Sequence, residues 1–278
     1  MKPRRLEVIL SVYRAERELR EVLEGYLRQV ETDFSIVLAD DGSGPGVERI
    51  ASEFADRGLR IRHMWQEDRG FRKCRILNRA VATSSADYLL LSDGDCIPSR
   101  HFVRDHLEWA EPGRYVCGRR VMLGEEVSNA ILLGELNPFE YENPIRLVAG
   151  EARGQLRHAW CGVRPPRPIA DLMSSRPRSL AGCNAAVWMT DLVRINGFNN
   201  AFEGWGYEDS ELEARLAAAG VRSKALRGRG VLFHLHHQSN FIRTNEDLLY
   251  LEQERSPVEA VSGLRETIAE CVVLDDPA

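Results

Sequence analysis

The sequence predicts an α/β protein with a mostly parallel central sheet flanked by helices. Short apolar runs alternate with amphipathic stretches over the first hundred residues, in the order β-α-β-α-β-α-β, and three of the apolar runs end in polar residues. Strands joined through helices pair in parallel by right-handed crossovers. The polar strand ends should therefore meet at one edge of the sheet, where such folds bind their ligands.

The spacing of apolar residues predicts each element of the first half. Leu19, Val22, Leu23 and Tyr26 recur at helical spacing, whereas the strands are short, nearly continuous apolar runs. The predicted strands are residues 6–12, 34–39, 59–65 and 88–91, and the helices between them are residues 16–29, 47–57 and 72–82.

The pattern is less regular beyond residue 118. Residues 137–180 are rich in Pro, Arg and Gly and are expected to form a flexible excursion. Around it we expect helices over 125–136, 191–196 and 208–219, regular structure over 181–189, and a last strand over 230–235. Residues 241–278 are predicted to be a C-terminal helical extension of a domain that covers residues 1–240.

Composition excludes several classes of protein. In 278 residues no stretch approaches the roughly 18 consecutive apolar residues of a membrane-spanning helix. A net charge of −5 argues against general nucleic-acid binding, although basic residues cluster between Arg153 and Arg178. The six cysteines show no C-x-x-C spacing, which predicts reduced thiols and a cytoplasmic protein.

Asp93-Gly94-Asp95 follows the most apolar of the predicted strands. Two carboxylates at this spacing can hold a hard divalent cation such as Mg²⁺ or Mn²⁺ together with phosphate oxygens. An Asp-x-Asp triplet alone is often only an acidic turn that caps the next segment. Its place at the carboxyl end of a buried strand favours the ligand site.

Two further polar segments lie near the same edge. Asp40 and Asp41 can accept hydrogen bonds from a base or a ribose hydroxyl, or can form an Asx-turn that caps the following helix, and both roles are compatible. Basic residues at the start of the 72–82 helix, including Lys73 and Arg75, can offset diphosphate charge, or can be a solvated helix face.

Gly204-Trp205-Gly206-Tyr207-Glu208-Asp209 places two carboxylates at the start of a predicted helix, directly after a Trp in a Gly-rich loop. An exposed aromatic face suits stacking on a sugar ring, and a neighbouring carboxylate can take a proton from a hydroxyl nucleophile. Acidic residues are also simply favourable in a first helical turn. Helix capping does not explain the Gly-Trp-Gly segment that precedes these two carboxylates.

A histidine cluster ends the last predicted strand. Alternation along residues 233–237 would put His234 and His236 on one face and His237 on the other. One of them can complete a metal site that begins at Asp95. The alternative is a solvated or core histidine without a ligand.

Taken together, these residues resemble glycosyltransferase family 2, over about residues 8–238. The family has the GT-A fold, with a Rossmann-like, mostly parallel sheet. Residues 11–13 and 39–43 resemble its nucleotide-binding segments, and Asp93-Gly94-Asp95 resembles its metal-binding DXD motif. A carboxy-terminal block of the galactosyltransferase and chondroitin-polymerase type is similar to residues 182–186, 197–198, 202–209 and 215–216. The chain departs from that block at Tyr207, where the family often has Gly.

The resemblance implies a role for each site residue and a nucleotide-binding half to about residue 118, followed by an acceptor-binding half over 119–240. The implied catalytic residues are Asp209, as base, and Glu208. The implied nucleotide-binding residues are Ser11, Tyr13, Asp40, Asp41, Arg75, Asp93 and Gly94. The implied sugar- or acceptor-binding residues are Trp205, Gly204, Tyr207 and Asn184. The implied metal ligands are Asp95, Asp93, His234 and His237.

The implied activity is an inverting, Mn²⁺- or Mg²⁺-dependent sugar transfer from a nucleotide sugar, with a UDP-sugar as the default donor. The acceptor would be a glycan or a lipid-linked saccharide in bacterial polysaccharide or lipopolysaccharide synthesis, with possible peripheral association at the inner face of the plasma membrane. A sugar nucleotidyltransferase would need a Gly-rich phosphate loop after the first strand, where residues 13–16 contain no Gly. A catalytically silent nucleotide-sugar or glycan-binding module has no need of both acidic motifs.

Overall fold

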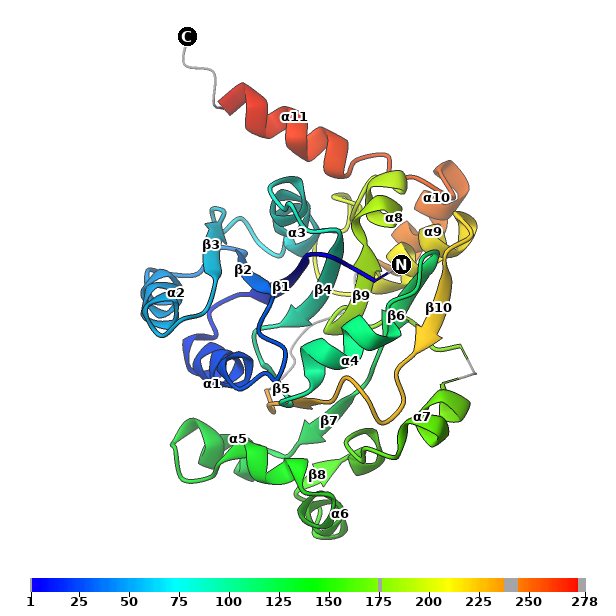
Figure 1. The fold of residues 1–278 in the computed structure, drawn as a ribbon. Helices are drawn as coiled ribbons and strands as arrows, with labels where there is room; N and C mark the ends of the chain where they lie inside the picture. Colours follow the sequence, from blue (N-terminus) through cyan, green and yellow to red (C-terminus); the bar gives the residue numbers. More distant parts are fainter. Residues whose placement is uncertain (1, 175–176, 238–244, 275–278) are drawn as a thin grey trace.

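The computed structural model describes residues 2–174, 177–237 and 245–274 and confirms the α/β class, with a seven-stranded sheet at its centre (Figure 1). The strands lie in the order β10-β6-β9-β4-β1-β2-β3, and β9 runs antiparallel to both of its neighbours while the remaining pairs are parallel. Their bounds are β1 Leu6–Val12, β2 Ser35–Asp40, β3 Ile61–Trp65, β4 Tyr88–Asp93, β6 Arg114–Cys117, β9 Asn184–Trp188 and β10 Arg222–Ala225.

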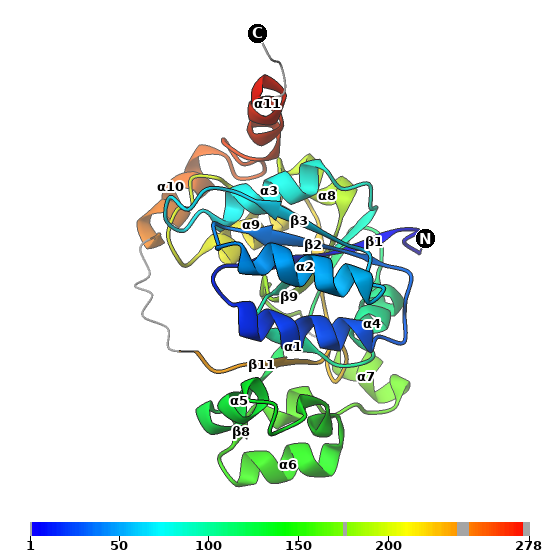
Figure 2. The ribbon, with the colours of Figure 1, turned by 90° about the vertical axis from the view of Figure 1, so that its left-hand side faces the viewer.

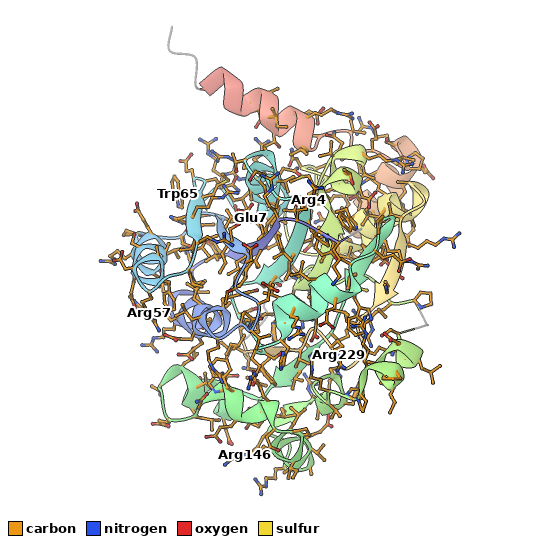
Figure 3. All side chains as sticks on the ribbon, in the orientation of Figure 1. Arg4, Glu7, Arg57, Trp65, Arg146 and Arg229 are labelled. Atoms are coloured by element: carbon orange, nitrogen blue, oxygen red, sulfur yellow. The ribbon has the colours of Figure 1, made fainter. Side chains whose placement is uncertain are left out.

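Helices cover both faces of this sheet (Figure 2). The first face carries α1 Glu16–Leu27, α2 Gly46–Asp56 and α4 Phe102–Trp109, and the second carries α3 Lys73–Ala82, α8 Met189–Arg194 and α9 Glu208–Ala218. Side chains fill the space between the layers (Figure 3) and form one apolar core on each face. The helices pack there because their apolar residues recur every three or four positions, as Leu19, Val22 and Leu23 do in α1.

A smaller four-stranded sheet lies beside the main one, in the order β5-β11-β7-β8. Its strands are β5 Cys96–Pro98, β7 Arg120–Leu123, β8 Leu156–Arg157 and β11 Leu232–His234. The strand β11 is antiparallel to β5 and parallel to β7. This sheet therefore brings the last strand of the domain next to the turn that follows β4.

The segment expected as an excursion contains short helices packed at the end of the molecule that carries β7 and β8 (Figure 2). They are η1 Pro138–Glu142, α6 Pro144–Ala152, η2 Ala159–Cys161 and α7 Arg167–Met173, and α5 Glu125–Leu132 precedes them. Asn137 and Asn143 cap the first two, because each side-chain oxygen accepts the backbone N–H two residues on, at 3.0 and 2.9 Å. A Pro follows each Asn at the first helical position, where no N–H is needed.

The described part of the C-terminal region is helical, with α10 Glu246–Arg255 and α11 Leu264–Leu274. Figure 1 shows α11 beside α3 and extending away from the sheet. Over the described residues, no helix combines the length and the apolar character that a membrane span requires.

Candidate active site

The turn after β4 places two carboxylates at the edge where β1 and β2 also end. Asp93 is the last residue of β4 and pairs in register with Ser11 of β1. The N–H of Gly94 donates to the carbonyl oxygen of Ser11 at 2.8 Å. A Cβ at Gly94 would lie 3.2 Å from that oxygen, so Gly lets the turn lie tightly against β1. Asp95 is thereby directed toward β11.

Asp95 meets two histidines from the end of β11. Its Oδ2 lies 3.5 Å from Nε2 of His234 and 3.3 Å from Nε2 of His237. One ligand atom from each of the three lies within 4.8 Å of the others. Burial alone raises the pKa of Asp95, but hydrogen bonds from both histidines outweigh it and hold this pKa well below its usual range. An ionised carboxylate with two imidazoles fits a divalent transition-metal ion such as Mn²⁺.

The histidine that accompanies His234 is not the one that alternation predicts. The strand β11 ends at His234, and the next N–H, of Leu235, donates to the carbonyl oxygen of Asp95 at 3.0 Å. The backbone N–H of His236 donates to Ser128 Oγ at 2.8 Å, and its ring is exposed. The placement of His234 and His236 on one face, opposite His237, is therefore wrong, because a side-chain period of two holds only inside a strand.

Lys73 connects the two acidic motifs. Its Nζ lies 3.0 Å from Asp93 Oδ1, and the side chain is mostly buried. Burial alone lowers the pKa of Lys73, but the charges of Asp93, Asp209 and Glu208 outweigh this and raise it above the ordinary lysine value. A permanent positive charge therefore lies among these carboxylates.

Arg75, predicted to contact the nucleotide, is directed toward α11 in this structure. Its guanidinium pairs with Glu270 of α11 at 2.6 Å, away from the turn after β4. Residues two apart on a helix differ by about 200° in direction, so Lys73 and Arg75 face opposite sides of α3. The basic stretch thus supplies one buried cation to the site through Lys73.

The Gly-rich loop before α9 is held in a conformation that few residues adopt. Gly204 and Gly206 have φ of +87° and +109°, and Tyr207, the residue before α9, has φ of +68°. The side-chain amide of Asn245 donates to the carbonyl oxygens of Gly204 and Gly206, both at 3.2 Å. These contacts fix the direction in which Trp205 and the first turn of α9 leave the loop.

Asp209 is oriented by the backbone just before β9. The N–H of Gly182 donates to Asp209 Oδ2 at 2.7 Å, and a Cβ at Gly182 would lie only 2.4 Å from Oδ1. Burial raises the pKa of Asp209, although Lys73 opposes the rise. Burial also raises the pKa of Glu208. The positive charge of Lys73 lowers this pKa, and the negative charge of Asp209 raises it further. A carboxylate with a raised pKa is a better proton acceptor near neutral pH.

The two aspartates at the end of β2 form hydrogen bonds within the protein. Asp40 is fully buried, its Oδ1 accepts the N–H of Ser43 at 2.8 Å, and its Oδ2 lies 2.8 Å from Nε2 of His63. Asp41 is 6% exposed and accepts the N–H of Arg72 at 2.7 Å. Both oxygens of Asp40 thus have partners inside the protein, as the Asx-turn alternative expects, and its nucleotide contact stays a prediction.

Asn184 is hydrogen-bonded at both ends of its side-chain amide. Its Nδ2 donates to the carbonyl oxygens of Arg119 at 2.9 Å and Gly230 at 2.8 Å, and its Oδ1 lies 3.0 Å from Nε2 of His106. The residue is fully buried. It joins β9 to the segments before β7 and β11, and its contact with an acceptor stays a prediction.

Three site residues received no role from the sequence. Gly182 has no side chain, so the sequence gives no sign that its backbone N–H donates to Asp209. Arg120 lies on β7 with Nη1 2.9 Å from Cys183 Sγ, and Asn245 lies beyond the predicted domain. Arg120 and Asn245 reach the site by contacts far apart in sequence, which no local pattern reveals. Ser11, Tyr13, Asp93 and Gly94 do share the predicted edge.

Two family profiles match the chain in succession. The profile described as "Glycosyl transferase family 2" matches residues 7–159, and the profile described as "N-terminal domain of galactosyltransferase" matches residues 173–238. The first covers the strands from β1 to β8, and the second covers β9, β10 and β11.

Curated relatives are about a quarter identical to this chain over the aligned residues. Chondroitin synthase of Escherichia coli is 24% identical over 234 residues, which are 80% of this chain and 34% of the relative. Validoxylamine A glucosyltransferase of Streptomyces hygroscopicus subsp. limoneus is 29% identical over 227 residues, which are 78% of this chain and 48% of the relative. The chain thus spans about a third to a half of the length of these relatives.

Solved structures share the fold. The mannosyltransferase PcManGT from Pyrobaculum calidifontis, in complex with GDP-Man and Mn²⁺, has a TM-score of 0.60 at 17% identity, over 100% of this chain and 66% of that one. TarS of S. aureus has a TM-score of 0.58 at 13% identity, over 97% of this chain and 43% of that one.

Proposed function

Because the chain belongs to glycosyl transferase family 2 and has the GT-A fold, we propose that it transfers a sugar from a nucleotide diphosphate donor to a hydroxyl group, with inversion and with a divalent metal. One observation carries this proposal. Lys73 pairs with Asp93 in the metal-binding turn and is held charged by Asp209 and Glu208, so the two acidic motifs share one site.

Asp95, His234 and His237, with Asp93 nearby, are the residues that would hold the metal. Mn²⁺ suits this donor set better than Mg²⁺, because imidazole nitrogen is a poor ligand for Mg²⁺. A similar structure is described as a complex with GDP-Man and Mn²⁺, which supports the choice. When bound, the ion supplies positive charge to the departing diphosphate.

Asp209 acts as the base. Its carboxylate takes the proton of the acceptor hydroxyl while that oxygen bonds to the anomeric carbon, and the bond from this carbon to the diphosphate breaks with its electron pair. One displacement inverts the anomeric centre. The hydrogen bond from Gly182 holds the carboxylate in place for the proton, and the charge of Lys73 limits the rise of its pKa.

Trp205, Tyr207 and Gly204 form the proposed sugar contacts. Trp205 is partly exposed between two glycines with positive φ, so its ring leaves the backbone at a fixed angle. An aromatic face in this position suits the apolar face of a sugar ring. Glu208, whose Oε2 accepts the N–H of Gly206 at 3.1 Å, would bind sugar hydroxyls beside it.

The donor, the acceptor and the cellular place are the finer parts of the proposal. We propose a UDP-sugar donor, with GDP-mannose as the first alternative to test. The names of the relatives, chondroitin synthase and hyaluronan synthase, support a growing polysaccharide or lipid-linked saccharide as acceptor. We further propose a cytoplasmic enzyme that meets such an acceptor at the inner membrane face, since Ile145 and Val148 of α6 expose apolar side chains and Arg153 follows this helix. Sedimentation with anionic vesicles tests this placement.

Thermal unfolding across a panel of nucleotide sugars, with and without Mn²⁺, tests the donor and the metal together. A ligand that binds the native state raises its apparent stability, by about 2.7 kcal/mol at 100 times its Kd. We expect the donor to raise the Tm only with Mn²⁺, and Asp95→Asn to abolish the effect. No metal-dependent rise with any donor would overturn the proposal.

Product analysis separates the other functions. A sugar transferase releases a nucleoside diphosphate, a nucleotidyltransferase releases pyrophosphate, and a silent binding module releases neither. We expect release of nucleoside diphosphate that depends on an acceptor saccharide and is lost in Asp209→Asn.

A further inference from the structure

Two cysteines lie directly behind the metal-binding turn. The sulfur atoms of Cys96 and Cys183 and a carboxylate oxygen of Asp93 lie within 4.8 Å of one another. Cys96 follows Asp95 and begins β5, whereas Cys183 lies between Gly182 and the start of β9. Both side chains are buried, at 0% and 4% exposure. The pair therefore joins the segment that carries the metal ligands to the segment that orients the base.

The surroundings of this pair favour thiol chemistry over a second metal ion. Arg120 Nη1 lies 2.9 Å from Cys183 Sγ, and Cys96 donates to Asp95 Oδ1 at 3.3 Å. The guanidinium places a positive charge next to the Cys183 sulfur. The same positive charge opposes a cation at this position. By contrast, Cys117 donates to a backbone carbonyl, that of Arg178, at 3.3 Å.

We propose that Cys96 and Cys183 are an oxidation site that closes into a disulfide and thereby inactivates the enzyme. The oxidant is a peroxide. The Cys183 sulfur attacks one peroxide oxygen and the O–O bond breaks. The departing hydroxide takes the thiol proton, so that the sulfenic acid forms and one water leaves. Cys96 sulfur then displaces the hydroxyl from Cys183 sulfur, and the Cys96 proton leaves with it as a second water. Two thiols and one hydrogen peroxide thus give one disulfide and two waters.

Inactivation follows from the positions of the two residues and rests on the proposed function. The sulfurs must approach to about 2.05 Å, which pulls the start of β5 toward the start of β9. Cys96 then loses the S–H that it donates to Asp95, and Gly182, next to Cys183, is displaced together with the N–H that holds Asp209. Because a displacement of about 1 Å at a reacting group can cost about 100-fold in rate, we expect a loss of that order.

The bond itself can be measured without an activity assay. Trypsin releases residues 80–100 and 179–194 as two peptides with one cysteine each. After treatment of the folded, reduced protein with hydrogen peroxide, we expect a linked pair that is two hydrogen atoms lighter than the sum of the two peptides and that dithiothreitol separates. If these peptides stay unlinked while the peroxide is consumed, the proposal is wrong, whatever the enzyme is found to transfer.

Three variants test the effect on transfer, each compared with its own untreated sample. We expect Cys96→Ala and Cys183→Ala to keep their activity under peroxide, and Cys161→Ala, a buried cysteine on η2, to lose activity as the parent does. Dithiothreitol should restore the parent and Cys161→Ala. Equal loss in Cys183→Ala would overturn the inactivation step. If no donor gives transfer, the proposed function fails, and the peptide measurement still decides the oxidation site.

Discussion

The substitution Gly182→Ala tests the assignment of Asp209 as base without altering a reactive group. A Cβ at this position would lie 2.4 Å from Asp209 Oδ1, whereas ordinary van der Waals contact begins at 3.4 Å. The difference, 3.4 minus 2.4, requires the carboxylate to move by about 1 Å. Gly182 does not have a positive φ, so alanine can adopt its backbone conformation without strain. The added methyl group therefore acts chiefly on the position of Asp209.

A displacement of about 1 Å can cost about 100-fold in rate, which is about 2.7 kcal/mol of transition-state stabilisation. We expect this loss in kcat, with little change in the KM for the donor, because the proposed donor site lies at the other motif. Gly44→Ala is the matched control, since a Cβ at exposed Gly44 meets nothing within 4 Å.

The double variant with Asp209→Asn decides whether the methyl group acts through that carboxylate. Initial rates of nucleoside diphosphate release would be measured for the parent, both single variants and the double variant. If Gly182→Ala acts only by displacing Asp209, the double variant should be as slow as Asp209→Asn alone, because coupled residues are not additive. Full additivity of the two losses, or an unchanged rate in Gly182→Ala, would refute the assignment.

Three further outcomes follow from the site. Asp209→Asn should lower kcat by about 100- to 10,000-fold, because the general base is lost. The Tm of this variant should stay equal or rise near neutral pH, because the raised pKa of Asp209 means that the folded state disfavours its charged form. The parent rate should rise with pH through the raised pKa of Asp209, and Lys73→Met, measured at saturating Mn²⁺, should move that rise to higher pH. His237→Ala should weaken Mn²⁺ binding in calorimetry by about tenfold or more, whereas His236→Ala should not.

Much of the sheet could be predicted because its strands are continuous apolar runs. The first strand has the predicted bounds, and β4 begins at Tyr88 as expected. Burial on both faces makes such strands apolar along their whole length, and few other structures produce that pattern. The positions of Asp93 and Asp95 at the carboxyl edge follow directly from the end of that run.

A strand that is apolar along its whole length does not reveal whether it runs parallel or antiparallel to its neighbours. Nothing in residues 184–188 distinguishes a parallel strand from the antiparallel β9, so the nearness of Gly182 and Cys183 to Asp93 could not be predicted. The start of an antiparallel strand lies at the edge where its parallel neighbours end. Two of the site residues that the sequence missed or left unassigned lie there for this reason.

Side-chain direction at helix starts and strand ends was the other source of error. The sequence shows four basic residues at the start of α3, but only the rotation of the helix decides that Lys73 meets Asp93 while Arg75 meets Glu270. Residues 137–180 were expected to form a flexible excursion because they are rich in Pro, Arg and Gly, and they contain two Asn-Pro pairs. These pairs are helix starts, because the Asn caps and the Pro occupies the first turn.

The position of β9 also bears on how this chain can be divided or recombined. The strand belongs to the segment matched by the second profile, yet it is inserted between β4 and β6 of the segment matched by the first. A fragment that stops near residue 160 would leave β4 and β6 without the strand that joins them, with two apolar edges open to aggregation. Exchange of the second segment between relatives would therefore replace an interior strand of the sheet, so a working chimera needs a β9 whose side chains fit both inherited neighbours.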